Sequence, residues 1–125
     1  MKTFAYLAAA AFALTATAVS AQSVESGYPR GSLAVAAIER GDLARAEALL
    51  KDDDLGATRD PARLINLGEV YMRTGRSAEA LAAWRAALAS TRHTEVETLG
   101  GRWMSTRELA REALARYETA GLGTR

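Results

Sequence analysis

Apolar residues along the middle of the chain follow a pattern that repeats after 34 residues. The segment GDLARAEALL begins at Gly41, and the similar segment GRSAEALAAW begins 34 positions later at Gly75. Apolar residues in both segments recur three and four positions apart, as they do along one face of a helix. The repeat predicts two consecutive helix-turn-helix units, over residues 27–60 and 61–94. The other matches at this offset are Leu33 with Leu67, Ala37 with Tyr71, Ala46 with Ala80, and Leu50 with Trp84.

The second unit combines small and large apolar residues in a way that favours close helix packing. Small residues at Gly68, Ala80 and Ala87 would let neighbouring helices approach one another. Large apolar residues would fill the remaining space between these helices. These larger residues are Leu67, Tyr71, Leu81 and Trp84.

Residues typical of helix ends mark the boundaries of these units. Asp60 would cap a helix that has Pro61 in its first turn, where the missing N–H of proline costs nothing. Gly75 suits the tight turn inside the second unit, as Gly41 does in the first. The residues expected to cap the helices after these turns are Asp42 and Ser77.

The helical pattern returns after the second unit, with a shift of 46 residues in place of 34. The matches at this shift are Gly121 with Gly75 and Tyr117 with Tyr71. They predict a helix over about residues 106–120, and the run Ser105 to Glu108 before and within it reads as a capping box. We expect the segment 105–121 to cover the apolar face of the second unit, with a short tail at 122–125.

Residues 95–104 occupy the extra length between these helices and read as a β-hairpin. Strands are expected near Glu95 to Thr98 and Arg102 to Met104, joined by a two-residue turn at Gly100-Gly101. A lone hairpin is marginal in water and would persist only if Trp103 or Val96 is buried against the neighbouring helices. Of the two, we expect Trp103 to be the anchor, so that Trp103→Ala costs about 3–5 kcal/mol. An irregular loop is the alternative. If Trp103 is exposed instead, the hairpin becomes the first choice for a contact with a partner.

The first 21 residues have the layout of a secretory signal peptide. Lys2 precedes an apolar run from Phe4 to Val19, and small residues lead up to a cleavage point after Ala21. This run is diluted by Ala and Thr and is shorter than the ~20 apolar residues that span a bilayer, so retention as a membrane anchor is the weaker alternative. We expect a periplasmic or secreted protein that has a flexible N-terminus at 22–26 and no stable membrane insertion after cleavage.

Charge and cysteine content exclude several classes of function. The chain has 16 Lys and Arg residues against 15 Asp and Glu residues. Loss of Lys2 with the signal peptide would make the two counts equal, so no net charge would attract nucleic acid or an anionic membrane. The sequence contains no cysteine, which excludes disulfides, zinc-thiolate sites and a thiol nucleophile.

No residue pattern indicates catalysis, a metal ion or a cofactor. His93 is the single histidine and follows a predicted helix end, where a polar or cationic residue is favoured. The run Lys51 to Asp54 lacks the alternating oxygen ligands, the glycine and the distal glutamate of a calcium loop. Gly100-Gly101-Arg102 lacks the spacing and the lysine of a phosphate loop. We expect no catalytic, metal-binding or cofactor-binding residues, and a small hydrolase is the remote alternative.

The second unit resembles a tetratricopeptide repeat. The family's residues stand here as Leu67-Gly68, Tyr71, Gly75, Ala80, Trp84 and Ala87. Leu64 occupies the position where the family often has tryptophan, and the proline that often ends a unit is missing. The first unit is degenerate, because Ala34 and Ala37 replace the family's glycine and tyrosine. The resemblance implies an all-α fold of antiparallel helix-turn-helix repeats, with two units, a final capping helix and a small hairpin insertion.

The same resemblance implies a concave groove that holds a peptide or a partner protein. The residues expected to line this groove are Ile65, Asn66, Glu69, Met72, Arg73 and Arg111, with Glu108 and Glu118 beside them. The prediction is a non-enzymatic interaction or scaffold module of the bacterial cell envelope. The alternative is a structural protein that self-associates through the exposed ends of its short stack.

Overall fold

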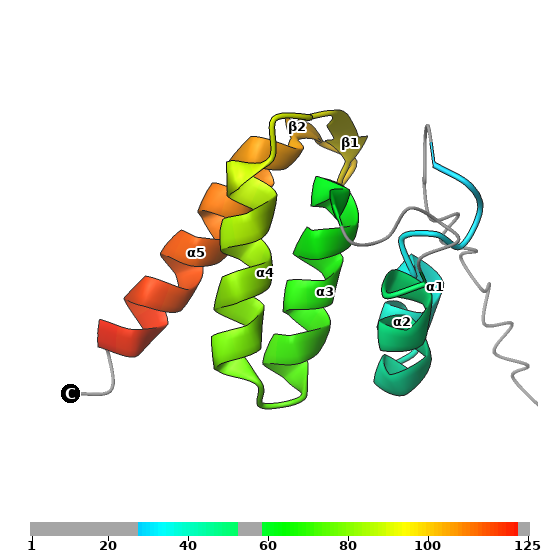
Figure 1. Ribbon diagram of the computed structural model, residues 1–125, viewed down its shortest axis with the longest axis horizontal. Helices are drawn as coiled ribbons and strands as arrows, with labels where there is room; N and C mark the ends of the chain where they lie inside the picture. Colours follow the sequence, from blue (N-terminus) through cyan, green and yellow to red (C-terminus); the bar gives the residue numbers. More distant parts are fainter. Residues whose placement is uncertain (1–27, 53–58, 123–125) are drawn as a thin grey trace, which may run out of the picture.

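Five helices and one β-hairpin make up the part of the chain that the computed structural model describes, residues 28–52 and 59–122. The elements are α1 (Val35–Glu39), α2 (Leu43–Leu50), α3 (Pro61–Arg73), α4 (Ser77–Ala89), β1 (Glu95–Glu97), β2 (Trp103–Ser105) and α5 (Thr106–Leu122). Helices α3, α4 and α5 lie side by side, and α1 and α2 lie beyond α3 (Figure 1). The predicted signal peptide, the segment 22–26 and residues 123–125 of the tail lie outside the described residues.

The two predicted turns have the same backbone geometry, which confirms the repeat at the level of hydrogen bonds. Gly41 and Gly75 both take a positive φ, 74° and 77°. In each turn the glycine N–H donates to the carbonyl three residues earlier, and the next residue donates across the turn: Asp42 to Ala37 at 2.9 Å and Arg76 to Tyr71 at 2.8 Å. These are the paired bonds of a Schellman motif, which favours glycine because other residues are strained at positive φ.

Two of the three predicted helix caps are confirmed. The Asp60 carboxylate accepts from the Arg63 N–H at 3.0 Å with Pro61 in the first turn, and Asp42 accepts from the Arg45 N–H at 3.3 Å. The prediction for Ser77 is wrong, because α4 already begins at Ser77 and its N-cap is Arg76. Arg76 is the residue 34 positions after Asp42, so the repeat itself places the cap there.

The first helix is shorter than the pattern indicates. α1 has only five residues, and a series of turns precedes it. Ser32 N–H donates to the Pro29 carbonyl at 3.0 Å, Gly31 takes a φ of 83°, and Ala34 takes a φ of 54°. Left-handed residues at both positions are incompatible with a continuous helix, so the degenerate unit keeps its turn and second helix but only the end of its first helix.

Side chains from both units fill two adjoining cores. One lies between the first unit and α3 and is formed by Ala34, Ala37, Ile38, Ala46, Leu50 and Val70. The other lies among α3, α4 and α5 and is formed by Tyr71, Ala80, Ala83, Trp84 and Ala113, with Leu67 and Tyr117 packed against it. Gly68 and Ala87 are also buried. The structural positions predicted in the second unit therefore lie in or against the core, apart from the turn glycine Gly75.

Two arginines connect the units in a way that the sequence does not reveal. Arg63 is 2 % exposed, and its guanidinium donates to the Leu49 carbonyl at 2.6 Å in the last turn of α2. A cation there complements both the free carbonyls and the dipole of a helix end. Arg76 makes two bonds to the Glu47 carboxylate, at 2.8 and 3.1 Å, and its guanidinium lies 4.2 Å from the centre of the Tyr71 ring. Hydrogen bonding from Arg76 lowers the pKa of Glu47 below its usual value.

The predicted hairpin is present, with a different turn and a different anchor. β1 and β2 pair antiparallel in the register Glu95–Ser105, Val96–Met104 and Glu97–Trp103. A four-residue turn from Thr98 to Gly101 replaces the predicted two-residue one, because only Gly101 has a positive φ and its N–H donates to the Thr98 carbonyl at 2.8 Å. This matches a type I turn that ends in a left-handed glycine.

Trp103 is not the buried anchor. It is 56 % exposed, whereas its neighbour Met104 is 9 % exposed. Successive side chains of a strand point to opposite faces, so a register that buries Met104 turns Trp103 outward. The hairpin is therefore anchored by a flexible thioether side chain in place of an indole ring.

The capping box at the start of α5 is confirmed. The Glu108 carboxylate accepts from the Ser105 N–H at 3.2 Å, and the Ser105 hydroxyl accepts from the Arg107 N–H at 3.1 Å. Thr106 is fully buried beside it, and its hydroxyl lies 3.1 Å from Nδ1 of His93. α5 ends at Leu122, one or two residues beyond the predicted end.

Candidate partner-binding groove

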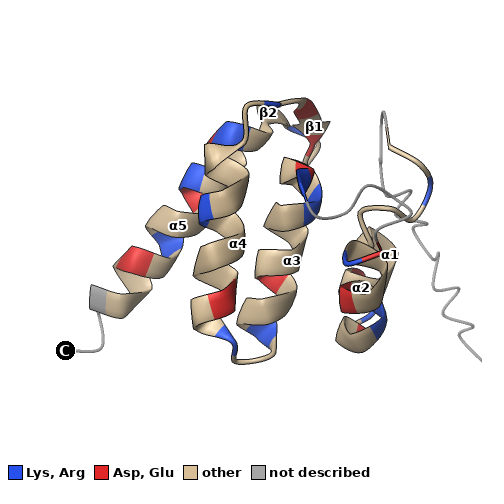
Figure 2. Cartoon of the chain, in the orientation of Figure 1, with Lys and Arg blue, Asp and Glu red and all other residues tan. Residues whose placement is uncertain are grey.

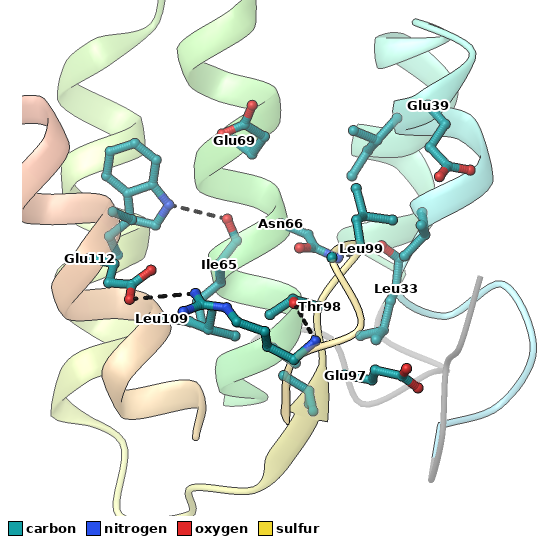
Figure 3. Close-up of a pocket in the computed structure, with 18 of the residues that line it drawn as sticks. Leu33, Glu39, Ile65, Asn66, Glu69, Glu97, Thr98, Leu99, Leu109 and Glu112 are labelled. Carbon is teal, nitrogen blue, oxygen red and sulfur yellow. Dashed lines mark hydrogen bonds and ion pairs between the residues drawn. The ribbon is translucent and has the colours of Figure 1, made fainter. Parts of the chain in front are cut away.

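A groove of about 800 Å³ runs between the first unit, α3, α5 and the hairpin. We use "the groove" for this hollow. Its wall from the first unit contains Leu33, Val35, Ile38 and Glu39; its floor on α3 contains Ala62, Ile65, Asn66, Glu69 and Arg73; its wall on α5 contains Leu109, Glu112, Ala113 and Arg116. Residues Val96 to Arg102 of the hairpin close one end, as Figure 3 shows for Thr98 and Leu99. The hollow is thus bordered by four separate parts of the chain.

Four of the six residues expected to contact a partner lie in the groove. They are Ile65, Asn66, Glu69 and Arg73. Asn66, Glu69 and Arg73 are three and four residues apart on one face of α3, and Ile65 lies next to Asn66 and four residues before Glu69. Met72 lies instead in a smaller hollow of about 190 Å³ that also contains Tyr117. The two hollows share Glu69 and Arg116 on their borders, so the smaller one continues the groove along α5.

Arg111 lies outside the groove, so its predicted contact with a partner stays a prediction that the groove does not support. Arg111 is exposed and borders neither hollow, and Glu108 and Glu118 do not border them either. The face of α5 toward the groove is formed by Leu109, Glu112, Ala113 and Arg116. Residues 109, 112, 113 and 116 have the spacing of one helix face, which the sequence shows. That this face lies toward the groove is shown only by the folded chain.

Two of the expected contact residues also hold the first unit in place. The Asn66 side-chain amide donates to the Leu33 carbonyl at 2.9 Å. Arg73 donates to the Ile38 carbonyl at 3.3 Å and pairs with Glu69 at 2.8 Å. Ile38 and Leu33 lie around the short helix α1, where an incomplete helix leaves few bonds of its own. These polar groups therefore stabilise the wall of the groove as well as lining it.

Tyr28 fixes the same wall from the N-terminal side. Its hydroxyl donates to the Asp60 carboxylate at 3.1 Å and lies 3.3 Å from the Thr94 hydroxyl, so it joins the first unit to α3 and to the segment before β1. Burial raises the pKa of the Tyr28 hydroxyl, and the nearby Asp60 charge acts in the same direction. The hydroxyl therefore stays protonated and remains a hydrogen-bond donor at neutral pH.

Charged groups in the groove are only partly paired with one another. Arg73 pairs with Glu69, and the Arg102 guanidinium lies 3.8 Å from the Glu112 carboxylate. A dashed line at Glu112 marks this second pair in Figure 3. Glu39 and Glu97 border the groove, and neither has an ion-pair partner among the described residues. The groove thus presents apolar side chains together with unpaired carboxylates on the side of α1 and β1. Sequence reasoning missed this, because α1 and the hairpin border the same groove only in the folded chain.

His93 and the acidic residues form no site of their own. His93 is half-buried, and its ring is hydrogen-bonded to the Thr106 hydroxyl. It therefore does not resemble an exposed general base. Within residues 28–52 and 59–122, no three His, Asp or Glu side chains gather closely enough to hold a metal ion. Of the predicted run Lys51 to Asp54, the last two residues lie outside the described part of the chain. No described helix is both long and apolar enough to cross a membrane.

Two helix-turn-helix units with matching turns, a shared core and a groove along their first helices define a helical repeat protein. The sequence matches the tetratricopeptide repeat family model twice, at residues 27–52 and 61–86, and these matches coincide with the two units. These two segments are tetratricopeptide repeats. Such repeats generally mediate protein–protein interaction, and the family is typically non-catalytic. Searches of curated proteins and of solved structures found no match to this chain.

Proposed function

We propose that this protein is an exported, non-enzymatic interaction module of the bacterial cell envelope that holds a peptide segment of a partner protein in the groove. The observation that carries this proposal is the groove itself, which combines apolar walls with polar groups from α1, α3, α5 and the hairpin. Peptide sites of this kind need apolar surface for affinity and a few placed polar groups for orientation. No bond is made or broken, and recognition rests on surface complementarity.

We infer that α5 ends the stack and acts as a capping helix. Its inner residues Ala110 and Ala113 are buried, whereas Arg107, Arg111 and Glu118 on its other side are exposed. Figure 2 shows basic and acidic residues in turn along the helix. Repeat stacks need an end helix with a polar outer face, because an apolar one would aggregate. This polar face argues against a self-associating structural protein that grows from this end.

Export is part of the proposal and rests on the signal-peptide layout of residues 1–21. Mass spectrometry of the protein recovered from cells tests it directly. The expected mass corresponds to a chain that begins at Gln22, recovered from the periplasm or the medium. Recovery of an intact chain from the cytoplasm would contradict export.

Site-specific photo-crosslinking tests the groove as the contact surface. A photoreactive amino acid would replace Glu112, which borders the groove, or Arg111, the next residue on the same helix, which does not. In envelope extract we expect a discrete crosslinked product from position 112 and none from position 111. Equal crosslinking from both positions, or from position 111 alone, would contradict the groove as the binding surface.

A further inference from the structure

The hairpin carries both of the large apolar side chains that the described residues leave exposed. Leu99 is 78 % exposed at the tip, and Trp103 is 56 % exposed on β2. Single exposed apolar residues are common, but two within five residues of one hairpin form a surface that a partner can cover. Leu99 borders the groove, whereas Trp103 follows the last groove-lining residue of the hairpin, Arg102, and lies outside the groove itself. Tryptophan is also the residue most enriched where binding energy concentrates in interfaces.

Carboxylates share the outward face of this hairpin with Trp103. Glu97 is paired directly with Trp103 across the strands, and Glu95 lies two residues earlier on the same face. Figure 2 shows the acidic colour along β1. Neither glutamate has an ion pair among the described residues, and Glu97 is half-buried at the border of the groove. The ring therefore lies beside negative charge that the folded chain leaves unbalanced.

No cation of the described chain covers the Trp103 ring. Arg102 is its neighbour in sequence, but the Arg102 guanidinium lies 3.0 Å from the Met104 sulfur and 3.8 Å from Glu112 on α5. The cation–π contact found in the described residues is that of the half-buried Arg76 with Tyr71. The face of Trp103 is thus available to a cation from another molecule.

We propose that the outward face of the hairpin binds a lysine or arginine side chain of the partner peptide, between the Trp103 ring and the Glu97 carboxylate. The proposal rests on the proposed function, since it names the chemistry of the peptide that the groove takes. An acidic peptide would be repelled by Glu95 and Glu97. A purely apolar one would cover the half-buried Glu97 without supplying a countercharge, which is costly. A basic side chain can make a cation–π contact with the Trp103 ring and an ion pair with the Glu97 carboxylate at the same time.

The rest of the groove fits an apolar side chain of the same peptide. Leu33, Ile65 and Leu109 line its walls beyond the hairpin, and Leu99 lies at its edge (Figure 3). Glu39 on the α1 wall also lacks an ion-pair partner among the described residues, and so does Arg116 on the opposite wall. The preference for a basic side chain therefore applies to the side of the groove formed by α1 and the hairpin. The partner segment thus carries a basic residue that follows or precedes an apolar one in an extended chain.

Panning a phage-displayed random dodecapeptide library against the purified protein tests this preference. We expect enriched peptides to contain Lys or Arg near a large apolar residue. Enrichment of acidic peptides, or of peptides without a charge preference, would overturn the inference while leaving groove binding intact. No enrichment over a protein-free surface would contradict the proposed function itself, so the two failures are distinguishable.

Fluorescence anisotropy with one labelled, enriched peptide then locates the basic side chain. Replacing its Lys or Arg by norleucine should weaken binding, and Trp103→Ala should weaken binding about two- to fivefold, with partial rescue by Trp103→Phe. Glu97→Gln should lower the affinity for the basic peptide but leave the affinity for the norleucine peptide unchanged. Glu118→Gln on the outer side of α5 serves as the matched control. Equal affinity of wild type and Glu97→Gln for the basic peptide, with folding verified by circular dichroism, would overturn the proposal.

Discussion

Replacing Gly68 by alanine tests the contact between α3 and α4 on which the second unit depends. A methyl group at residue 68 would lie 2.5 Å from Cδ1 and 2.7 Å from Cε2 of Trp84, where carbon atoms prefer about 3.5–4.0 Å. The indole cannot easily move away, because Trp84 is 4 % exposed and its Nε1–H donates to the Ile65 carbonyl at 3.1 Å. A shift of about 1 Å would break this hydrogen bond.

The expected loss of stability follows from three contributions. Overpacking costs about 1–3 kcal/mol, loss of the Trp84 hydrogen bond costs about 0.5–1.5 kcal/mol, and the better helix propensity of alanine returns about 1 kcal/mol. The net expectation for Gly68→Ala is a decrease of about 0.5–3.5 kcal/mol in the free energy of unfolding. Urea denaturation followed by circular dichroism would measure it as a lower midpoint at constant slope.

Gly121→Ala is the matched control for this experiment. Gly121 also lies in a helix, but a methyl group there would meet no atom within 4 Å. This variant should leave the stability unchanged or raise it slightly, since alanine favours the helix. If Gly68→Ala were as stable as Gly121→Ala, the close approach of α3 to the Trp84 ring would be wrong, and so would the packing of the second unit.

Three further measurements test other parts of the structure. In urea denaturation, Met104→Ala should lower the free energy of unfolding by about 2 kcal/mol and Trp103→Ala by less than about 0.5 kcal/mol, because Met104 is buried and Trp103 is exposed. A larger loss for Trp103→Ala than for Met104→Ala would show that Trp103 is the anchor after all. The lowered pKa of Glu47 means that its pairing with Arg76 contributes full stability above the usual glutamate value of 4.5 and loses it as the pH falls through the lower folded value. Glu47→Gln should therefore lose less stability than wild type as the pH falls below 4.5. If the stability of both proteins fell equally steeply with pH, the pairing of Glu47 with Arg76 would make no contribution. Light scattering should find a monomer at all concentrations, since the outer face of α5 is polar; a concentration-dependent mass would favour self-association.

The repeat unit could be predicted from the sequence because its information is local. Gly75, Ala80 and Trp84 are placed by helix periodicity and by turn chemistry, and each acts on residues of the same unit or its neighbour. The capping box at Ser105 and Glu108 is local for the same reason. Two similar segments 34 residues apart therefore indicated the repeat without knowledge of any distant contact, and the matching turns of the structure confirm it.

The features that escaped prediction depend on contacts between distant segments. The choice between Trp103 and Met104 as anchor is a choice of strand face, which a three-residue strand cannot indicate by alternation. The buried Arg63 donates to the Leu49 carbonyl at the end of α2, fourteen residues earlier in the chain. No neighbouring residue in the sequence indicates that this arginine is buried. Arg111 was assigned to the groove by position in the repeat, whereas the rotation of α5 is fixed by burial of Ala110 and Ala113.

The central claim is that the groove, including the hairpin, receives a peptide. A titration of the ¹⁵N-labelled protein with an enriched basic peptide, followed by two-dimensional NMR, tests it most directly. The account predicts that amide signals of Ile65, Glu97, Leu99 and Glu112 shift together, while that of Arg85 on the exposed side of α4 does not. Shifts confined to α4 and to the outer side of α5, with the groove and hairpin unaffected, would contradict it.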